Sequence, residues 1–168
     1  MTDEQRPDVS AVLEPLKEFQ EQTARYVFDR LYTDEEYARR FLVADEVGLG
    51  KTLVARAVIA QAIDHLWDDR DRIDIVYLCS NGSIARQNLD RLVLDEDQEH
   101  AFTSRITLLP KTAHSFDENK VNYISFTPGT SLDLKSSMGR KEERVLLYYL
   151  LKEPWNLTGK APLNVLQG

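Results

Sequence analysis

The sequence predicts an α/β fold in which helices flank a parallel sheet, and three observations lead to this class. Apolar stretches of strand length alternate along the chain with longer stretches of helical periodicity. The clearest strand runs from Ile73 to Cys79. A glycine-bearing turn lies between the apolar run Phe41 to Ala44 and the helical pattern Leu53 to Leu66. With 168 residues, 42% of them apolar, the chain has about the size and composition of one domain with a core.

The elements are expected in the following order. Residues 1–15 are expected to be a flexible lead-in, because Pro7 and Pro15 break regular structure. A helical period follows from Leu16 to Tyr32, and Phe41 to Ala44 is expected to be a short buried strand. The later elements are helix 51–66, strand Ile73 to Cys79, helix Ile84 to Leu94, strands Ser104 to Leu109 and Val121 to Phe126, and helix Arg140 to Leu151. Such alternation favours a parallel sheet wrapped on both faces, with ligand sites at the carboxyl ends of the strands.

The most informative segment is the glycine loop, Asp45-Glu46-Val47-Gly48-Leu49-Gly50-Lys51-Thr52. Gly48 and Gly50 allow the backbone to curl with its N–H groups pointing inward. The N-terminus of the next helix adds donors and a partial positive charge. Lys51 would reach the outer phosphates of a nucleotide, and the Thr52 hydroxyl would ligate Mg²⁺. The loop therefore predicts a nucleoside triphosphate site, although the strict pattern has glycine where this chain has Asp45.

Composition excludes several classes of protein. The net charge of −7 argues against a generally basic nucleic-acid coat, although a local basic stripe is compatible with it. No apolar run approaches the ~20 residues of a membrane span, and the polar, acidic N-terminus excludes a signal peptide. The single cysteine, Cys79, cannot form an internal disulfide, and no Cys/His spacing suggests a metal site. A reducing cytoplasm, or a nucleus in a eukaryote, is the expected compartment, and no membrane partner is expected.

The glycine loop resembles motif I of the superfamily 2 helicases and translocases. Its Asp-Glu opening is most similar to the Snf2-like branch, where Asp commonly replaces the first glycine or alanine. The resemblance covers residues 16–150 and implies a P-loop NTPase fold of the RecA-like type, with residues 16–168 as an incomplete N-terminal ATP-binding lobe. It implies ATP and Mg²⁺ as cofactors, Lys51 and Thr52 as catalytic residues and Thr52 as a metal ligand. The ATP contacts that it implies lie at Gln20, Asp45, Glu46, Val47, Gly48, Leu49, Gly50, Lys51 and Thr52.

The segment Leu16 to Gln20 resembles the one that contacts adenine in that superfamily. The Gln20 side chain would read the base, because one amide can both donate to and accept from its edge. Gln22 is a nearby competitor for this role, and an exposed helical glutamine is the plainer interpretation of Gln20.

Two strand-end turns resemble the nucleic-acid-binding motifs of the superfamily. The segment Leu78 to Asn88 lies where motif Ia is expected, and Phe126 to Ser131 resembles motif Ib. The residues implied to contact a nucleic-acid backbone, with DNA favoured over RNA, are Ser80, Asn81, Arg86, Gln87, Thr127, Gly129 and Thr130. The plainer interpretations are helix capping by Ser83 with solvated neighbours, and a Pro-Gly turn. A basic stretch that would extend the phosphate track, or form a solvated helix face, contains Lys135, Arg140, Lys141 and Arg144.

The acidic segment Leu92 to Gln98 superficially resembles the magnesium-binding Asp-Glu box of the superfamily. It leaves no room for a separate strand and precedes the Ib-like turn, so a solvated acidic loop is expected. Without that box the chain lacks the carboxylates that hydrolysis needs. We therefore expect a fragment of a larger motor, whose partners include a second RecA-like lobe. The alternatives are a stand-alone P-loop kinase or signalling NTPase using Asp95 or Glu96, and a non-catalytic module that binds nucleotide or nucleic acid.

Overall fold

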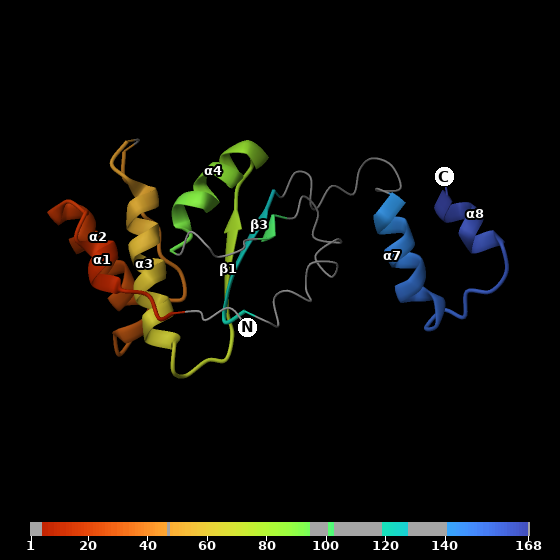
Figure 1. Cartoon of the computed structure of the whole chain (residues 1–168), viewed down its shortest axis with the longest axis horizontal. Helices are drawn as coiled ribbons and strands as arrows, with labels where there is room; N and C mark the ends of the chain where they lie inside the picture. The colour runs from red at the N-terminus through yellow and green to blue at the C-terminus, as the bar shows by residue number, and fades with distance from the viewer. Residues whose placement is uncertain (1–4, 47, 95–100, 103–118, 128–140, 168) are drawn as a thin grey trace.

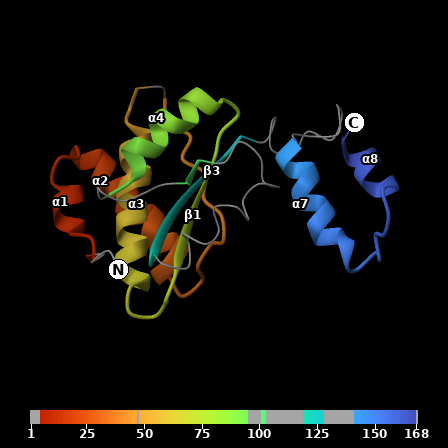
Figure 2. The ribbon, with the colours of Figure 1, turned by 45° about the vertical axis from the view of Figure 1, so that its right-hand side comes forward.

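The computed structural model describes residues 5–46, 48–94, 101–102, 119–127 and 141–167. Its elements are α1 (Val9–Leu13), α2 (Glu18–Phe28), the π-helical turn η1 (Asp29–Thr33), α3 (Lys51–Leu66), β1 (Ile73–Leu78), α4 (Gly82–Leu92), β2 (Ala101–Phe102), β3 (Val121–Phe126), α7 (Lys141–Lys152) and α8 (Ala161–Gln167). Figure 1 shows layers that run from α1 and α2 through α3 to the sheet. Helices α7 and α8 pack on each other and stand apart from these layers in Figures 1 and 2.

The sheet is parallel and has the strand order β1-β3-β2. Strand β3 pairs with β1 from Val121 opposite Ile73 to Phe126 opposite Leu78, and the short β2 pairs with its other edge. Parallel pairing requires a crossover between strands, and α4 lies between β1 and β3 in the chain. The structure thus confirms the mixed α/β class. Because Leu78 and Phe126 lie opposite each other, the chain leaves β1 and β3 at the same edge of the sheet.

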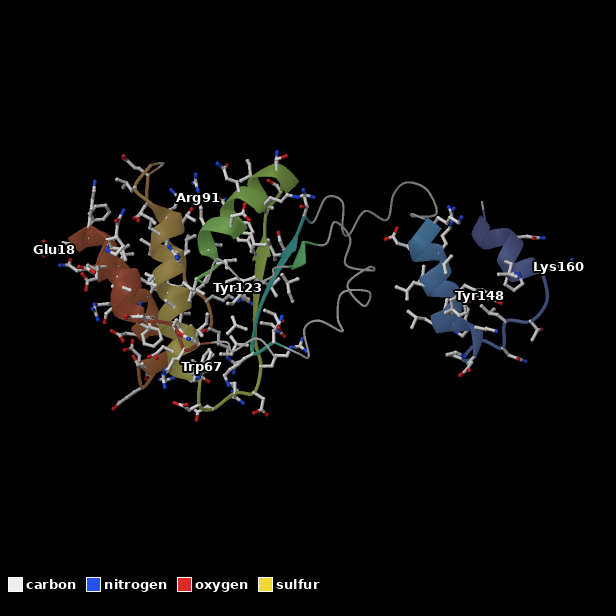
Figure 3. The ribbon with its side chains drawn as sticks, viewed as in Figure 1. Glu18, Trp67, Arg91, Tyr123, Tyr148 and Lys160 are labelled. Atoms are coloured by element: carbon white, nitrogen blue, oxygen red, sulfur yellow. The ribbon has the colours of Figure 1, made fainter. Side chains whose placement is uncertain are left out.

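Helix α3 lies between two clusters of buried side chains. The cluster toward the sheet contains Ile63, Ile73, Leu89, Val93, Val121 and Tyr123. The cluster toward α1 and α2 contains Leu13, Ala24, Val54 and Ala57. Figure 3 shows Tyr123 between α3 and β3, and burial raises the pKa of its hydroxyl to about 12.

The predicted helix over residues 51–66 is confirmed at both ends by α3. Ala57 and Ala60 have no exposed surface, because small side chains let the neighbouring layers approach the helix closely. Past its last turn, Trp67 lies under the Lys120 ammonium group, 5.0 Å from the ring centroid. The predictions for the helix starting at Leu16, for β1, for β3 and for α7 also hold to within a few residues.

The predicted buried strand from Phe41 to Ala44 is wrong. This segment is assigned to no helix or strand, and Leu42 is 82% exposed. The Phe41 ring instead contacts Tyr26 of α2 edge-on, with ring centroids 5.7 Å apart. A strand needs a hydrogen-bonded neighbour, and no strand in the described part of the chain pairs with this run.

Two further differences concern the N-terminal segment and the faces of the sheet. The lead-in predicted for residues 1–15 contains α1, capped by the Asp8 carboxylate at 3.1 Å from the Ala11 amide nitrogen. The expected sheet covered on both faces is only partly formed, because Val76 and Leu78 of β1 are 51% and 62% exposed on the side away from α3. The strand predicted for residues 104–109 lies outside the described residues. Within the described ranges, no helix combines the length and apolarity of a membrane span.

We predict that Leu89→Ala lowers the free energy of unfolding by about 2–5 kcal/mol, because it leaves a cavity in a fully buried site. Leu42→Ala removes the same atoms from a side chain that is 82% exposed, and should change that free energy by no more than about 0.5 kcal/mol. Urea unfolding of both variants measures the difference. Equal losses of unfolding free energy in the two variants would contradict the exposure of Leu42 and support a buried strand at residues 41–44.

Candidate functional site

The glycine loop lies at the start of α3 and contains two glycines with left-handed backbone angles. Gly48 has φ +92° and Gly50 has φ +84°, values that residues with a Cβ rarely adopt. Gly50 caps α3, since its carbonyl accepts hydrogen bonds from the amides of Leu53 at 2.8 Å and Val54 at 3.1 Å. The free N–H groups of the first turn and the dipole of this 16-residue helix therefore face the loop.

Lys51 folds back over the loop that precedes it. Its Nζ donates to the backbone carbonyls of Asp45 and Glu46, both at 2.8 Å. Lys51 and Gly48 are exposed, and Thr52 is half-buried beside them, so a ligand from solvent can reach these groups. The loop thus gathers a cation, a hydroxyl and a helix N-terminus, which is the donor set of an anion site. Val47 lies outside the described residues.

The Gln20 side chain lies against the glycine loop, although it comes from α2. Gln20 is only 6% exposed, and its Oε1 accepts from the Lys17 amide at 2.9 Å. Its Nε2 donates to the Leu49 carbonyl, also at 2.9 Å, across 29 residues of sequence. Gln22, the competitor, is exposed and donates to Glu18 Oε1 at 3.1 Å. The adenine-reading role of Gln20 stays a prediction.

One of the two hydrogen bonds of Gln20 can be predicted from the local sequence. Lys17 is the N-cap of α2 and Gln20 is its third helical residue, the position from which a capping-box side chain bonds back to the N-cap amide. That position predicts the bond to Lys17. The bond to Leu49 has no local signal, because it depends on how α2 and α3 pack together.

The predicted nucleic-acid contacts in this part of the chain lie between the end of β1 and the middle of α4. Ser80, Asn81, Arg86 and Gln87 are all exposed after the end of β1. Asn81 is the N-cap of α4, since its Oδ1 accepts from the amides of Ser83 at 2.9 Å and Ile84 at 3.2 Å. The expected capping by Ser83 is therefore wrong, and the Asn81 side chain already has partners inside the chain.

Of the second group of predicted nucleic-acid contacts, the structure places only Thr127 near the end of β1. Thr127 follows β3 next to the end of β1, but it is 6% exposed, so its side chain is not presented at the surface. Gly129, Thr130, Lys135 and Arg140 lie outside the described residues, whereas Lys141 and Arg144 belong to α7. Figures 1 and 2 both show the glycine loop and the carboxyl ends of β1 and β3 at the same end of the molecule.

Thr52 is the predicted Mg²⁺ ligand that the structure places beside Lys51. In the described ranges, no group of three or more His, Cys, Asp or Glu residues is arranged to hold a metal ion. Asp95 and Glu96, the acidic residues of the rival prediction, lie outside those ranges. Mg²⁺ commonly keeps several waters and binds through phosphate oxygens with few protein ligands, so a single hydroxyl fits a nucleotide-bound ion.

A cavity of about 520 Å³ lies away from the glycine loop. Its lining includes Arg6, Val12, Arg56, Trp67 and Tyr123, and thus comes from the N-terminal segment, from α3 and from β3. None of the residues that line it belongs to the glycine loop. The candidate anion site is therefore an open surface at the start of α3 and is separate from this cavity.

Comparison of the chain with family models, with curated proteins and with solved structures finds no match.

We predict that Gly50→Ala destabilises the protein more than Gly48→Ala. Both residues have positive φ, which costs an alanine about 1–2 kcal/mol. A Cβ at Gly48 meets nothing within 4 Å, whereas a Cβ at Gly50 collides with Gln20 Nε2 and costs about 1 kcal/mol more through the displaced hydrogen bond. Denaturant unfolding of the two variants measures these free energies. A loss at Gly48 equal to that at Gly50 would show that Gln20 does not constrain the loop.

Proposed function

We propose that the chain is the ATP-binding lobe of a nucleic-acid helicase or translocase of Snf2-like type, with a RecA-like P-loop fold. The observation that carries the proposal is the glycine loop at the N-terminus of α3, with Lys51 folded back over it. A parallel sheet beside a helix that begins in this loop supports the fold type. The Asp-Glu opening of the loop supports the Snf2-like branch.

The chemistry of the loop suits a triphosphate. Lys51 Nζ is bonded to two neutral carbonyls, and phosphate oxygens would replace these with acceptors that carry a full negative charge. The partial positive charge at the N-terminus of α3 adds to that attraction. Mg²⁺, when bound with the nucleotide beside Thr52, would neutralise phosphate charge.

Binding, rather than turnover, is the activity proposed for this chain. Phosphoryl transfer to water in this class needs acidic residues that hold the metal and position the water. The parts of the chain that the structure describes contain no acidic cluster of that kind. In the proposed motor, the remaining groups come from elsewhere, including the second RecA-like lobe. A kinase or signalling NTPase would depend on Asp95 or Glu96, which lie outside the described residues.

The exposed group at the start of α4 supports nucleic acid as the partner. Ser80, Arg86 and Gln87 are exposed and offer a hydroxyl, a guanidinium and an amide, and such groups contact phosphates without reading sequence. The start of α4 and the glycine loop lie on the same side of the layers in Figures 1 and 2, so both ligands would bind on that side.

Lys51→Ala should weaken ATP binding roughly 10- to 100-fold, because it removes a charged donor to the phosphates. Isothermal titration calorimetry with ATP and Mg²⁺ measures the affinity. Lys160→Ala is the matched control, since it removes the same charge from the residue just before α8, away from the glycine loop, and should leave the affinity unchanged (Figure 3). Undiminished binding by Lys51→Ala would exclude the glycine loop as the phosphate site.

Arg86→Ala should weaken binding of single-stranded DNA at low salt and reduce the slope of log K against log[salt] by about 0.7, the value for one lost phosphate contact. Arg91→Ala provides the control, because Arg91 is also exposed on α4 but lies in its last turn (Figure 3). Fluorescence anisotropy over a salt series measures both. An equal effect of the two substitutions would indicate a general charge effect and not a site at the start of α4.

A further inference from the structure

Side-chain hydrogen bonds hold the backbone of the glycine loop at two places. Its first half is held from within, because Lys51 Nζ binds the carbonyls of Asp45 and Glu46. Its second half is held from outside, because Gln20 Nε2 binds the carbonyl of Leu49. The first half is held by Lys51, the side chain that a phosphate ligand would bind. The second half is held by Gln20, a side chain of another helix.

We infer that Gln20 is a positioning residue that fixes the second half of the glycine loop, an inference that rests on the proposed function. Gln20 is 6% exposed, and both of its amide heteroatoms are engaged, with Lys17 on one side and Leu49 on the other. A side chain held in this way sets the position of the Leu49–Gly50 peptide. Gly50 in turn caps α3, so Gln20 also determines where the first turn of α3 begins.

The close packing around the Gln20 side-chain amide indicates a specific contact with the glycine loop. A Cβ at Gly50 would overlap Gln20 Nε2, so the residue at position 50 must be glycine for the amide to reach Leu49. The bond to Lys17 holds the other end of the amide and orients its NH₂ group toward the loop. The contact thus depends on four positions, Lys17 and Gln20 at the start of α2 and Leu49 and Gly50 in the glycine loop.

Ligand binding would affect these two sets of hydrogen bonds differently. When phosphates engage Lys51, its bonds to Asp45 and Glu46 are exchanged for bonds to the ligand. The bond from Gln20 to Leu49 uses no group that the phosphates need, so it persists in both states. Gln20 therefore keeps the donors at the start of α3 in place while the first half of the loop rearranges, and its effect is independent of the nucleotide base.

Two substitutions separate this role from helix capping. Gln20→Ala removes both hydrogen bonds. Gln20→Glu keeps the acceptor for the Lys17 amide but replaces the donor to Leu49 with an oxygen that the carbonyl repels. Gln22→Ala is the control, because Gln22 is an exposed glutamine on the same helix, and its side chain donates to Glu18.

The first measurement is the affinity for ATP, GTP and inorganic tripolyphosphate. We expect Gln20→Ala and Gln20→Glu each to weaken binding of all three ligands about 3- to 10-fold and by a similar factor, and Gln22→Ala to weaken none. A loss confined to ATP would overturn the inference and make Gln20 a reader of the base. Wild-type behaviour of Gln20→Glu would overturn it as well, by reducing Gln20 to a helix cap.

The second measurement needs no nucleotide and separates this inference from the proposed function. The amides of Leu53 and Val54 are bonded to the Gly50 carbonyl, so their hydrogen exchange reports on the start of α3. Exchange at these two amides should be at least 3-fold faster in Gln20→Glu, with exchange in α4 unchanged. Unchanged exchange at both would overturn the inference. Absence of triphosphate binding by the wild-type chain would instead reject the proposed function and leave the exchange result to decide the role of Gln20.

Discussion

The position of α3 between two buried clusters is the constraint on which the rest of the structure depends. Val54 and Ala57 pack toward α1 and α2, whereas Ile63 packs on the sheet. A displacement of the helix would open both clusters at once, and each buried side chain that is lost costs ~2–5 kcal/mol. Since α3 is fixed from two sides, its first turn is fixed too. The location of the glycine loop is therefore a consequence of core packing.

Local sequence patterns predict the elements whose causes are local. Helix α3 follows from a long apolar period after Gly50, and β1 follows from its alternation and its β-branched residues. The glycine loop is likewise readable, because the need for positive φ selects glycine at positions 48 and 50. Lys51 and Thr52 then follow at the only spacing that brings them to the helix N-terminus. These features could all be predicted without knowing what packs against them.

The features that could not be predicted depend on partners far away in the sequence. The apolar run at 41–44 indicates burial, but periodicity does not say which strand it pairs with, and here Phe41 meets Tyr26 instead. Asn81 and Ser83 are both good caps, and only the actual start of α4 decides between them. The contact of Gln20 with Leu49 requires the packing of α2 on α3, which no residue pattern near position 20 encodes.

The same distinction explains why the two halves of the glycine loop differ. Its second half is joined to α3 and to Gln20, both of which belong to the packed layers. Its first half follows a segment that joins no strand of the described sheet and in which Leu42 is 82% exposed, and it is held by Lys51 Nζ. A ligand that binds Lys51 would therefore compete with the hydrogen bonds that hold the first half of the loop, whereas the second half stays joined to α3 and to Gln20.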